Sequence, residues 1–84
     1  MTRLWPTGVS IHVGIDRRGR LLHFSWQSRV YQVQQTQQRW QVDTEWWGER
    51  VWRDYFAVTT TDGLLCVLYH NLPDGTWYLS KLYD

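Results

Sequence analysis

The sequence predicts an all-β fold: a small antiparallel barrel or coiled sheet of six to seven short strands, with little or no helix. Its size is that of SH3-like or OB-like modules. Turn residues recur at intervals of about 8–12 residues, and the segments between them alternate apolar and polar residues. Aromatic residues make up 17% of the 84 residues, with seven Trp, five Tyr and two Phe. Because so small a domain needs large side chains to fill its core, we expect most rings to be buried and a few to remain outside.

The N-terminal part of the chain predicts an arm followed by a hairpin. Residues 1–8 include a proline and a glycine and are expected to form a loosely held, flexible arm. The single β domain then covers residues 9–84. Residues 9–15 alternate strictly between apolar and small or polar side chains, which is the strongest strand signal in the chain. A polar turn with a glycine at 16–20 and a second extended segment at 21–26 complete a hairpin.

The middle of the chain is rich in glutamine and leaves two interpretations open. Residues 31–34 and 40–43 both alternate, with β-branched or aromatic side chains in the apolar positions, which favours two strands joined around 36–38. Glutamine also forms helix readily, so a short helix is the alternative. Residues 44–49 are expected to be a connection that is interrupted by a glycine.

The C-terminal part predicts three strands. Residues 51–60 form a long run of strand-forming residues, and the Asp-Gly turn at 61–63 joins them to a partner strand at 64–69. A turn with a proline at its second position and a glycine at its fourth spans 72–75. The alternating segment 76–83 closes the fold.

The composition excludes several classes of protein. The formal net charge is +1, far from the charge excess of a disordered tail or a histone-like protein. No run approaches the roughly 18 apolar residues of a membrane helix, and the first residues lack the pattern of a secretory signal. The single cysteine, Cys66, forms no internal disulfide, which is typical of a reducing compartment. We expect a cytoplasmic protein, a monomer or a weak homo-oligomer, with no membrane partner.

No residue pattern indicates catalysis or metal binding. His12, His23 and His70 lie far apart in the sequence, whereas zinc sites use Cys or His in close pairs. Cys66 lies in an apolar run, where a buried and inert thiol is expected. The chain has neither a Gly-rich phosphate loop nor a nucleophile motif. We therefore expect no enzyme activity, no catalytic residue, no metal and no cofactor.

Positive charge is concentrated in the first part of the chain. Residues 1–53 contain eight Arg and four acidic residues, whereas residues 54–84 contain one Lys and four acidic residues. Arg17, Arg18 and Arg20 share the turn of the first predicted hairpin, where three guanidinium groups can reach the phosphates of a nucleic acid. An ordinary solvated turn is the alternative, because dedicated nucleic-acid binders are usually more basic than this chain.

Trp46 and Trp47 form the second candidate site. Adjacent residues of an extended chain point to opposite sides, so one ring can be buried while the other is exposed to stack on or anchor a partner. Alternatively, both rings pack against neighbouring strands. Trp26, Tyr31 and Trp40 can line a groove for an extended peptide, although core positions are favoured for all three.

Arg53 and Asp54 are expected to serve structure rather than chemistry. Neighbours in a strand point to opposite faces, so each of the two charged groups needs a different partner. Glu45 and Glu49 are the candidates for an ion pair with Arg53.

An ordered series of short motifs resembles a known family. The series consists of Phe24-Ser25-Trp26-Gln27-Ser28-Arg29, Val33, Trp40, Glu45-Trp46-Trp47-Gly48, Arg53-Asp54-Tyr55-Phe56, Asp62-Gly63, Trp77-Tyr78-Leu79 and Tyr83-Asp84. It is similar to the small domain of unknown function at the C-terminal end of bacterial Y-family polymerase homologues of the SOS-inducible mutagenesis cassette, which also occurs as a stand-alone protein. The resemblance covers about residues 9–84. It departs from the family pattern at Ser28, where Gly is expected, and at His70-Asn71, where Arg-Asp is usual. The resemblance implies a context of DNA damage tolerance and carries over no catalytic residue.

Together these features favour a non-enzymatic binding module. The leading hypothesis is an accessory of translesion synthesis that contacts single-stranded DNA or a Y-family polymerase-type partner. In this hypothesis Arg17, Arg18 and Arg20 bind phosphates, and Trp46 and Trp47 stack or anchor. The alternative is a protein–protein adaptor that uses an exposed aromatic surface and contacts no nucleic acid. A third option is self-association through an open sheet edge.

Overall fold

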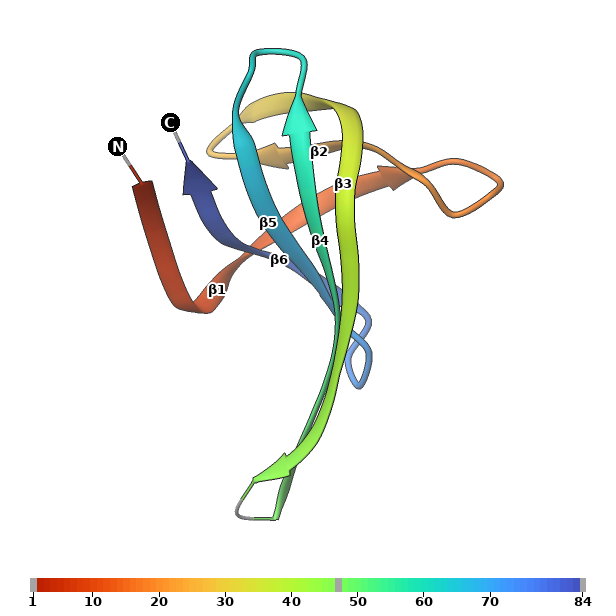
Figure 1. The fold of residues 1–84 in the computed structure, drawn as a ribbon, viewed down its shortest axis with the longest axis vertical. Coiled ribbons are helices and arrows are strands. Elements are labelled where there is room, and N and C mark those ends of the chain that lie inside the picture. Colours follow the sequence, from red (N-terminus) through yellow and green to blue (C-terminus); the bar gives the residue numbers. More distant parts are fainter. Residues whose placement is uncertain (1, 47, 84) are drawn as a thin grey trace.

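Six antiparallel strands form a closed barrel in the computed structural model, which describes residues 2–46 and 48–83 (Figure 1). Each strand pairs with the next one in the sequence and the last returns to the first, so the order is that of a meander rather than a Greek key. The predicted fold class, an all-β small barrel, is confirmed. The strands are β1 (Thr2–Ile15), β2 (Leu21–Trp26), β3 (Arg29–Trp46), β4 (Glu49–Thr60), β5 (Leu65–Asn71) and β6 (Thr76–Tyr83).

Strand β1 begins much earlier than the sequence suggested. Residues 2–8, expected to be an arm, are part of this strand, and Thr2–Leu4 pair with Lys81–Tyr83 of β6. The ladder is interrupted between Leu4 and Val9 and then resumes. The proline and the glycine in this segment therefore mark a bend within a strand, where β1 turns sharply in Figure 1. Pairing of β1 with β6, at Thr2–Leu4 and again at Val9–Ile11, closes the barrel.

Strand β3 is continuous, which corrects the prediction of two strands or a short helix. Two irregularities in its pairing with β4 lie between Val33 and Gln35 and between Thr36 and Gln38. A bulge shifts the alternation of side chains by one residue, so in a single sequence it looks like the end of one strand and the start of another. The glutamine-rich segment is strand throughout.

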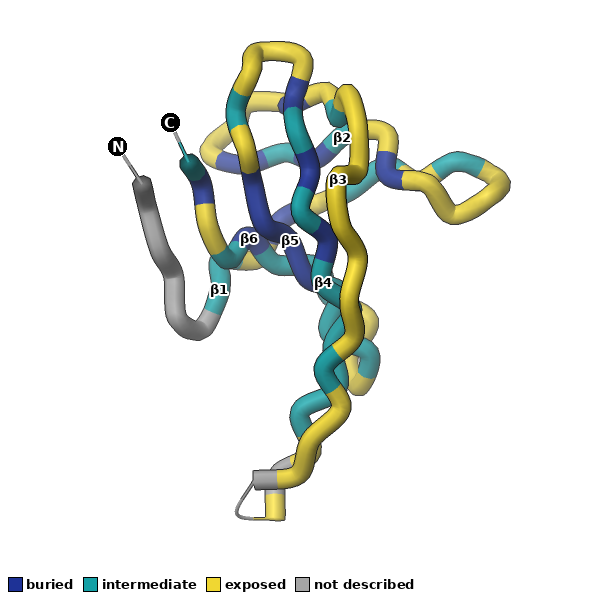
Figure 2. Tube along the Cα trace, viewed as in Figure 1, coloured by how far each residue is buried: buried dark blue, intermediate teal, exposed yellow. Residues whose placement is uncertain are grey.

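The end of the β3–β4 hairpin extends beyond the barrel. Pairing continues to Trp46 and Glu49, so residues 44–49 are mostly strand and not the predicted connection. Beyond the pairing of Arg53 with Asn71, β4 has no strand partner except β3. Residues 43–46 and 49–52 therefore form a protruding two-stranded hairpin, and none of its described side chains is buried (Figures 1 and 2).

Among the described side chains, an ion pair and a cation–π contact join the two strands of the protruding hairpin and neighbours on one of them. The guanidinium of Arg50 donates two hydrogen bonds of 3.2 Å to the carboxylate of Asp43 on the opposite strand. The same guanidinium lies over the ring of Trp52, 4.5 Å from its centroid. Both contacts join residues on one face of this two-stranded segment.

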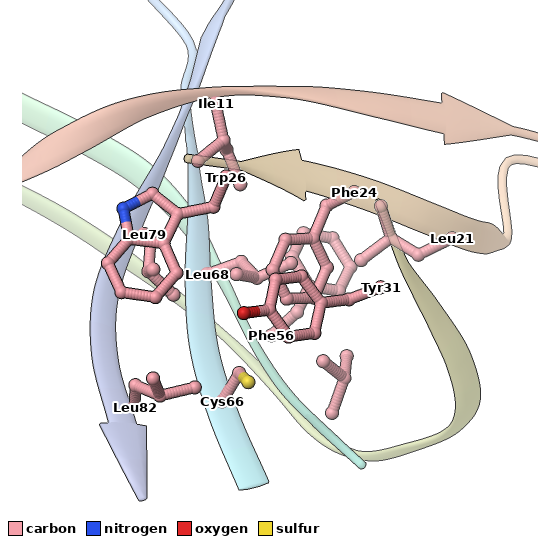
Figure 3. Packing of buried hydrophobic residues seen from close by; sticks show 11 residues of the cluster. Ile11, Leu21, Phe24, Trp26, Tyr31, Phe56, Cys66, Leu68, Leu79 and Leu82 are labelled. Carbon is pink, nitrogen blue, oxygen red and sulfur yellow. The ribbon is translucent and has the colours of Figure 1, made fainter. Parts of the chain in front are cut away.

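The barrel interior contains the aromatic core that the composition predicted. Phe24 and Tyr31 are stacked with 5.1 Å between ring centroids, and Trp26 lies against Tyr31 at 6.4 Å (Figure 3). Trp26 and Tyr31 are thus core residues and line no peptide groove. The full cluster is Ile11, Leu21, Phe24, Trp26, Tyr31, Phe56, Val58, Cys66, Leu68, Leu79 and Leu82. Cys66 is fully buried, as expected for an inert thiol.

Candidate functional site

The β1–β2 turn is held in one conformation by its first residue. The carboxylate oxygen Oδ1 of Asp16 accepts hydrogen bonds from the backbone N–H groups of Arg18 (2.8 Å) and Arg20 (2.9 Å). The backbone N–H of Asp16 donates to the carbonyl of Arg20, and that of Gly19 donates to the carbonyl of Asp16, both at 3.0 Å. Gly19 has φ = 80°, which a glycine adopts without strain. The turn therefore presents Arg17, Arg18 and Arg20, here called the tip cluster, from a fixed backbone.

Two arginines of the tip cluster have no carboxylate partner among the described residues. Arg17 and Arg18 are exposed, whereas Arg20 is 3.6 Å from Asp16 Oδ2 in an exposed pair that contributes little. The other described arginine side chains are engaged: Arg29 pairs with Asp62, Arg39 with Asp54 and Arg50 with Asp43, and Arg53 contacts Tyr55 and Tyr69. The tip cluster is thus the place where the described part of the barrel presents unpaired arginine charge.

Asp16 remains ionised beneath this cluster. The hydrogen bond from the backbone of Arg20 lowers the pKa of Asp16, and the backbone of Arg18 and the charge of Arg20 act in the same direction. Because this pKa is lower in the folded protein than the usual value of about 3.9, the stabilisation of the turn by the carboxylate is present at neutral pH. This stabilisation is lost as the pH falls through the lowered pKa of Asp16.

A depression adjoins the tip cluster. The pairing of β2 with β3 ends at His23 and Gln32, and beyond this point the two strands separate. The space between them has a volume of about 420 Å³ and is lined by polar and apolar groups in about equal measure, the apolar ones coming from β2 and from the start of β3. Its lining residues are Asp16, Arg20, Leu21, Leu22, Val33, Gln34, Gln35 and Thr36. Arg20 therefore belongs to both the tip cluster and the depression.

Of the two predicted tryptophans, Trp46 has a described backbone, which lies away from the tip cluster. Trp46 ends β3, and its backbone pairs with Glu49 near the end of the protruding hairpin. Trp47 lies outside the described residues, as does the side chain of Trp46. Figure 1 shows the β1–β2 turn and the end of the protruding hairpin well separated from each other. The structure therefore does not place Trp46 beside Arg17, Arg18 and Arg20.

Four aromatic rings form a row on the outside of the barrel, which the sequence analysis missed. Trp40, Tyr55, Tyr69 and Tyr78 are cross-strand neighbours on β3, β4, β5 and β6. Successive ring centroids are 5.3, 5.2 and 5.0 Å apart, with stacked geometry at each step. The sequence places an aromatic residue in each of these strands, but only the register aligns them. We call these four residues the aromatic row.

Arg53 packs on this row, which corrects its predicted ion pair with Glu45. Its guanidinium lies 4.5 Å from the centroid of Tyr69 and donates a hydrogen bond of 3.2 Å to the hydroxyl of Tyr55. Burial alone lowers the pKa of Arg53, but this hydrogen bond and the neighbouring tyrosine oxygens outweigh burial and raise it. The side chain of Glu49 lies outside the described residues. Asp54 lies on the opposite face and pairs with Arg39 at 3.3 Å, so the two neighbours do have different partners.

The described residues contain no group of three or more His, Cys, Asp or Glu side chains placed to hold a metal ion. Within the same part of the chain, no helix has the length and apolar character needed to cross a membrane. Comparison of the chain with protein-family models, with curated proteins and with solved structures found no match.

Proposed function

We propose that this protein is a non-enzymatic module that binds single-stranded DNA, with the tip cluster on the phosphates. The observation that carries the proposal is the pair Arg17 and Arg18, which have no carboxylate partner among the described residues and lie on a turn that Asp16 holds rigid. The planar guanidinium group binds phosphate with two parallel hydrogen bonds. A fixed backbone reduces the conformational entropy that binding must overcome.

The depression beside the tip cluster supports a single strand over a duplex. A strand that leaves Arg17 and Arg18 meets Arg20 and then the side-chain amides of Gln34 and Gln35. Amides donate and accept hydrogen bonds at the edges of unpaired bases, which a duplex hides in its interior. The net charge of only +1 predicts modest affinity that depends strongly on salt.

The resemblance to the C-terminal domain of Y-family polymerase homologues supports DNA as the nucleic acid. It also supports a place in DNA damage tolerance beside a polymerase, and the single cysteine, which forms no internal disulfide, supports the cytoplasm as the compartment. This context is part of the proposal.

A pair of charge variants tests the proposal. In R17Q/R18Q, the negative slope of log affinity against log salt should become less steep by about 0.7 for each phosphate that the variant no longer binds. Binding at low salt should be roughly 3- to 10-fold weaker than that of the wild type. The matched control R50Q/K81Q removes two exposed positive charges far from the turn and should bind almost as the wild type does. Fluorescence titration with a twelve-residue thymidine oligonucleotide measures both variants. Equal weakening in the two variants would show that net charge alone matters and would contradict a site at the turn.

Asp16→Asn provides a second test of the tip cluster. The amide oxygen of asparagine can accept the same two backbone hydrogen bonds, so the turn should keep its shape. The net charge of residues 16–20 rises from +2 to +3, and we expect about two- to threefold tighter binding at low salt. Asp16→Ala, which removes the acceptor as well, should not show this increase in affinity because the turn loosens. Weaker binding by D16N than by the wild type would contradict the assignment.

A protein–protein adaptor is the second candidate function, and exposed apolar side chains favour it. Ile15 and Leu22 are exposed on either side of the β1–β2 turn, and Val30 and Leu65 are exposed elsewhere on the barrel. Capture of a polymerase by the wild type but not by folded W46A/W47A, together with no binding of oligonucleotides, would favour this alternative.

A further inference from the structure

The aromatic row has one closed end and one open end. At the closed end the hydroxyl of Tyr78 donates a hydrogen bond of 3.3 Å to Asp74, and the backbone of Gly8 lies against Tyr69 and Tyr78. Tyr69 is only 3% exposed as a result. At the other end Trp40 is 36% exposed. The row is therefore anchored on β5 and β6 and reaches solvent on β3.

The row stops at Trp40 because the sheet stops there. Strand β3 pairs with β2 only from Arg29 to Gln32, and beyond this segment β4 is the strand that pairs with it in the described part of the chain. Trp40 and Tyr55 are nearly parallel, with an angle of 7° between their planes. The second face of the indole thus points past an unpaired sheet edge, and no ring among the described side chains stacks on it.

The open end of the row suits a planar ligand group. Rings already repeat about every 5 Å along the row, so a further ring on Trp40 continues the same spacing. Every nucleobase has a π face, and proteins that bind single strands use aromatic side chains as stacking platforms. Because Tyr55 holds the indole in place, binding orders little that is mobile.

The position of Trp40 also matches the proposed path of the strand. Thr36 lines the depression that contains Arg20, and Trp40 follows on the same strand beyond the bulge between Thr36 and Gln38. Their partners on β4, Val58 and Tyr55, are three residues apart, which corresponds to about 10 Å at the usual rise. In Figure 1, β3 runs along the side of the barrel from which the β1–β2 turn projects. A single strand anchored at the tip cluster can therefore follow the unpaired edge of β3 to Trp40.

We infer that Trp40 is a base-stacking residue and that one base of the bound strand continues the aromatic row on its outer face. This inference rests on the proposed function and extends it, because it adds a contact to a base to the contacts with phosphates. Trp40 takes any of the bases, since stacking is largely indifferent to sequence.

Two ligands separate stacking from phosphate binding: the thymidine 12-mer and an abasic 12-mer with the same phosphates. We expect W40L to bind the thymidine 12-mer about 5- to 100-fold more weakly than the wild type does and to bind the abasic strand about equally well. Trp40→Phe keeps an aromatic face and should retain most of the affinity. The matched control W52L removes an indole that contacts Arg50 in the protruding hairpin and should bind both ligands as the wild type does.

The outcomes distinguish this inference from the proposed function. If W40L and the wild type discriminate equally between the two ligands, the inference is overturned, whereas weaker binding by R17Q/R18Q still supports the tip cluster. If the wild type binds neither ligand, both proposals fail. A measurement on the unmodified protein covers the case in which W40L does not fold. A 12-mer with 5-bromouracil should photo-crosslink to the peptide that contains Trp40, and crosslinks confined to other peptides would also overturn the inference.

Discussion

Replacing Phe24 with alanine is expected to lower the free energy of unfolding by about 3–5 kcal/mol. The ring of Phe24 is fully buried at 0% exposure and stacks on Tyr31 inside the barrel. Removing it forfeits the transfer of a large apolar group from water and leaves a cavity that the surrounding strands fill only partly. A chain of 84 residues has a total stability of about 4–13 kcal/mol, so this variant should lie close to the limit of folding.

Leu22→Ala is the matched control for this prediction. Leu22 lies on the same strand two residues away, and it is 46% exposed. We expect a change within about 0.5 kcal/mol for this variant. Urea denaturation at low temperature measures both variants. A similar decrease in the free energy of unfolding for both variants would contradict the burial of Phe24 and the exposure of Leu22 on this strand.

Gly8→Ala has the second largest expected effect, about 2–4 kcal/mol of lower stability. Gly8 has φ = 76°, which residues with a Cβ atom adopt only with strain. A Cβ atom at this position would also lie 2.6 Å from the hydroxyl oxygen of Tyr69 and 2.9 Å from Cβ of Tyr78. Both distances are far below van der Waals separation, so the bend in β1 would have to move away from the aromatic row.

Gly75→Ala isolates the contribution of this close packing. Gly75 has φ = 72°, but a Cβ atom there would meet nothing within 4 Å. Gly75→Ala therefore has the backbone strain without the steric clash, and we expect it to cost only about 1 kcal/mol. The difference between the melting temperatures of the two variants measures the packing of Gly8 on the row. Equal melting temperatures would contradict that packing.

Local signals predicted much of the fold. Residues 9–15 and 21–26 form the expected hairpin, and the Asp62-Gly63 turn joins β4 to β5 as expected. These elements depend on alternation and on turn residues, both of which are visible within about ten residues of sequence. The tip cluster could be located for the same reason, because its three residues share one local turn.

The features that were missed depend on contacts between distant segments. Residues 2–4 are strand because they pair with β6, and the bulges of β3 take their meaning from the register with β4. Trp40 could not be recognised as part of a stack, since the aromatic row aligns residues from four strands. Nothing within 40–43 distinguishes an exposed ring that continues a row from a core ring, so the sequence favoured the core.

The most direct test of the claim that the tip cluster binds the phosphates of single-stranded DNA is a titration of the unmodified protein with the thymidine 12-mer at several salt concentrations. Tryptophan fluorescence reports the binding. The tip cluster predicts measurable binding at about 50 mM salt and a slope of log affinity against log salt of roughly −2, as three phosphates at about 0.7 each require. Affinity should thus fall by roughly 15- to 20-fold between about 50 and 200 mM salt. No binding at low salt, or binding that is insensitive to salt, would contradict a site built on Arg17, Arg18 and Arg20.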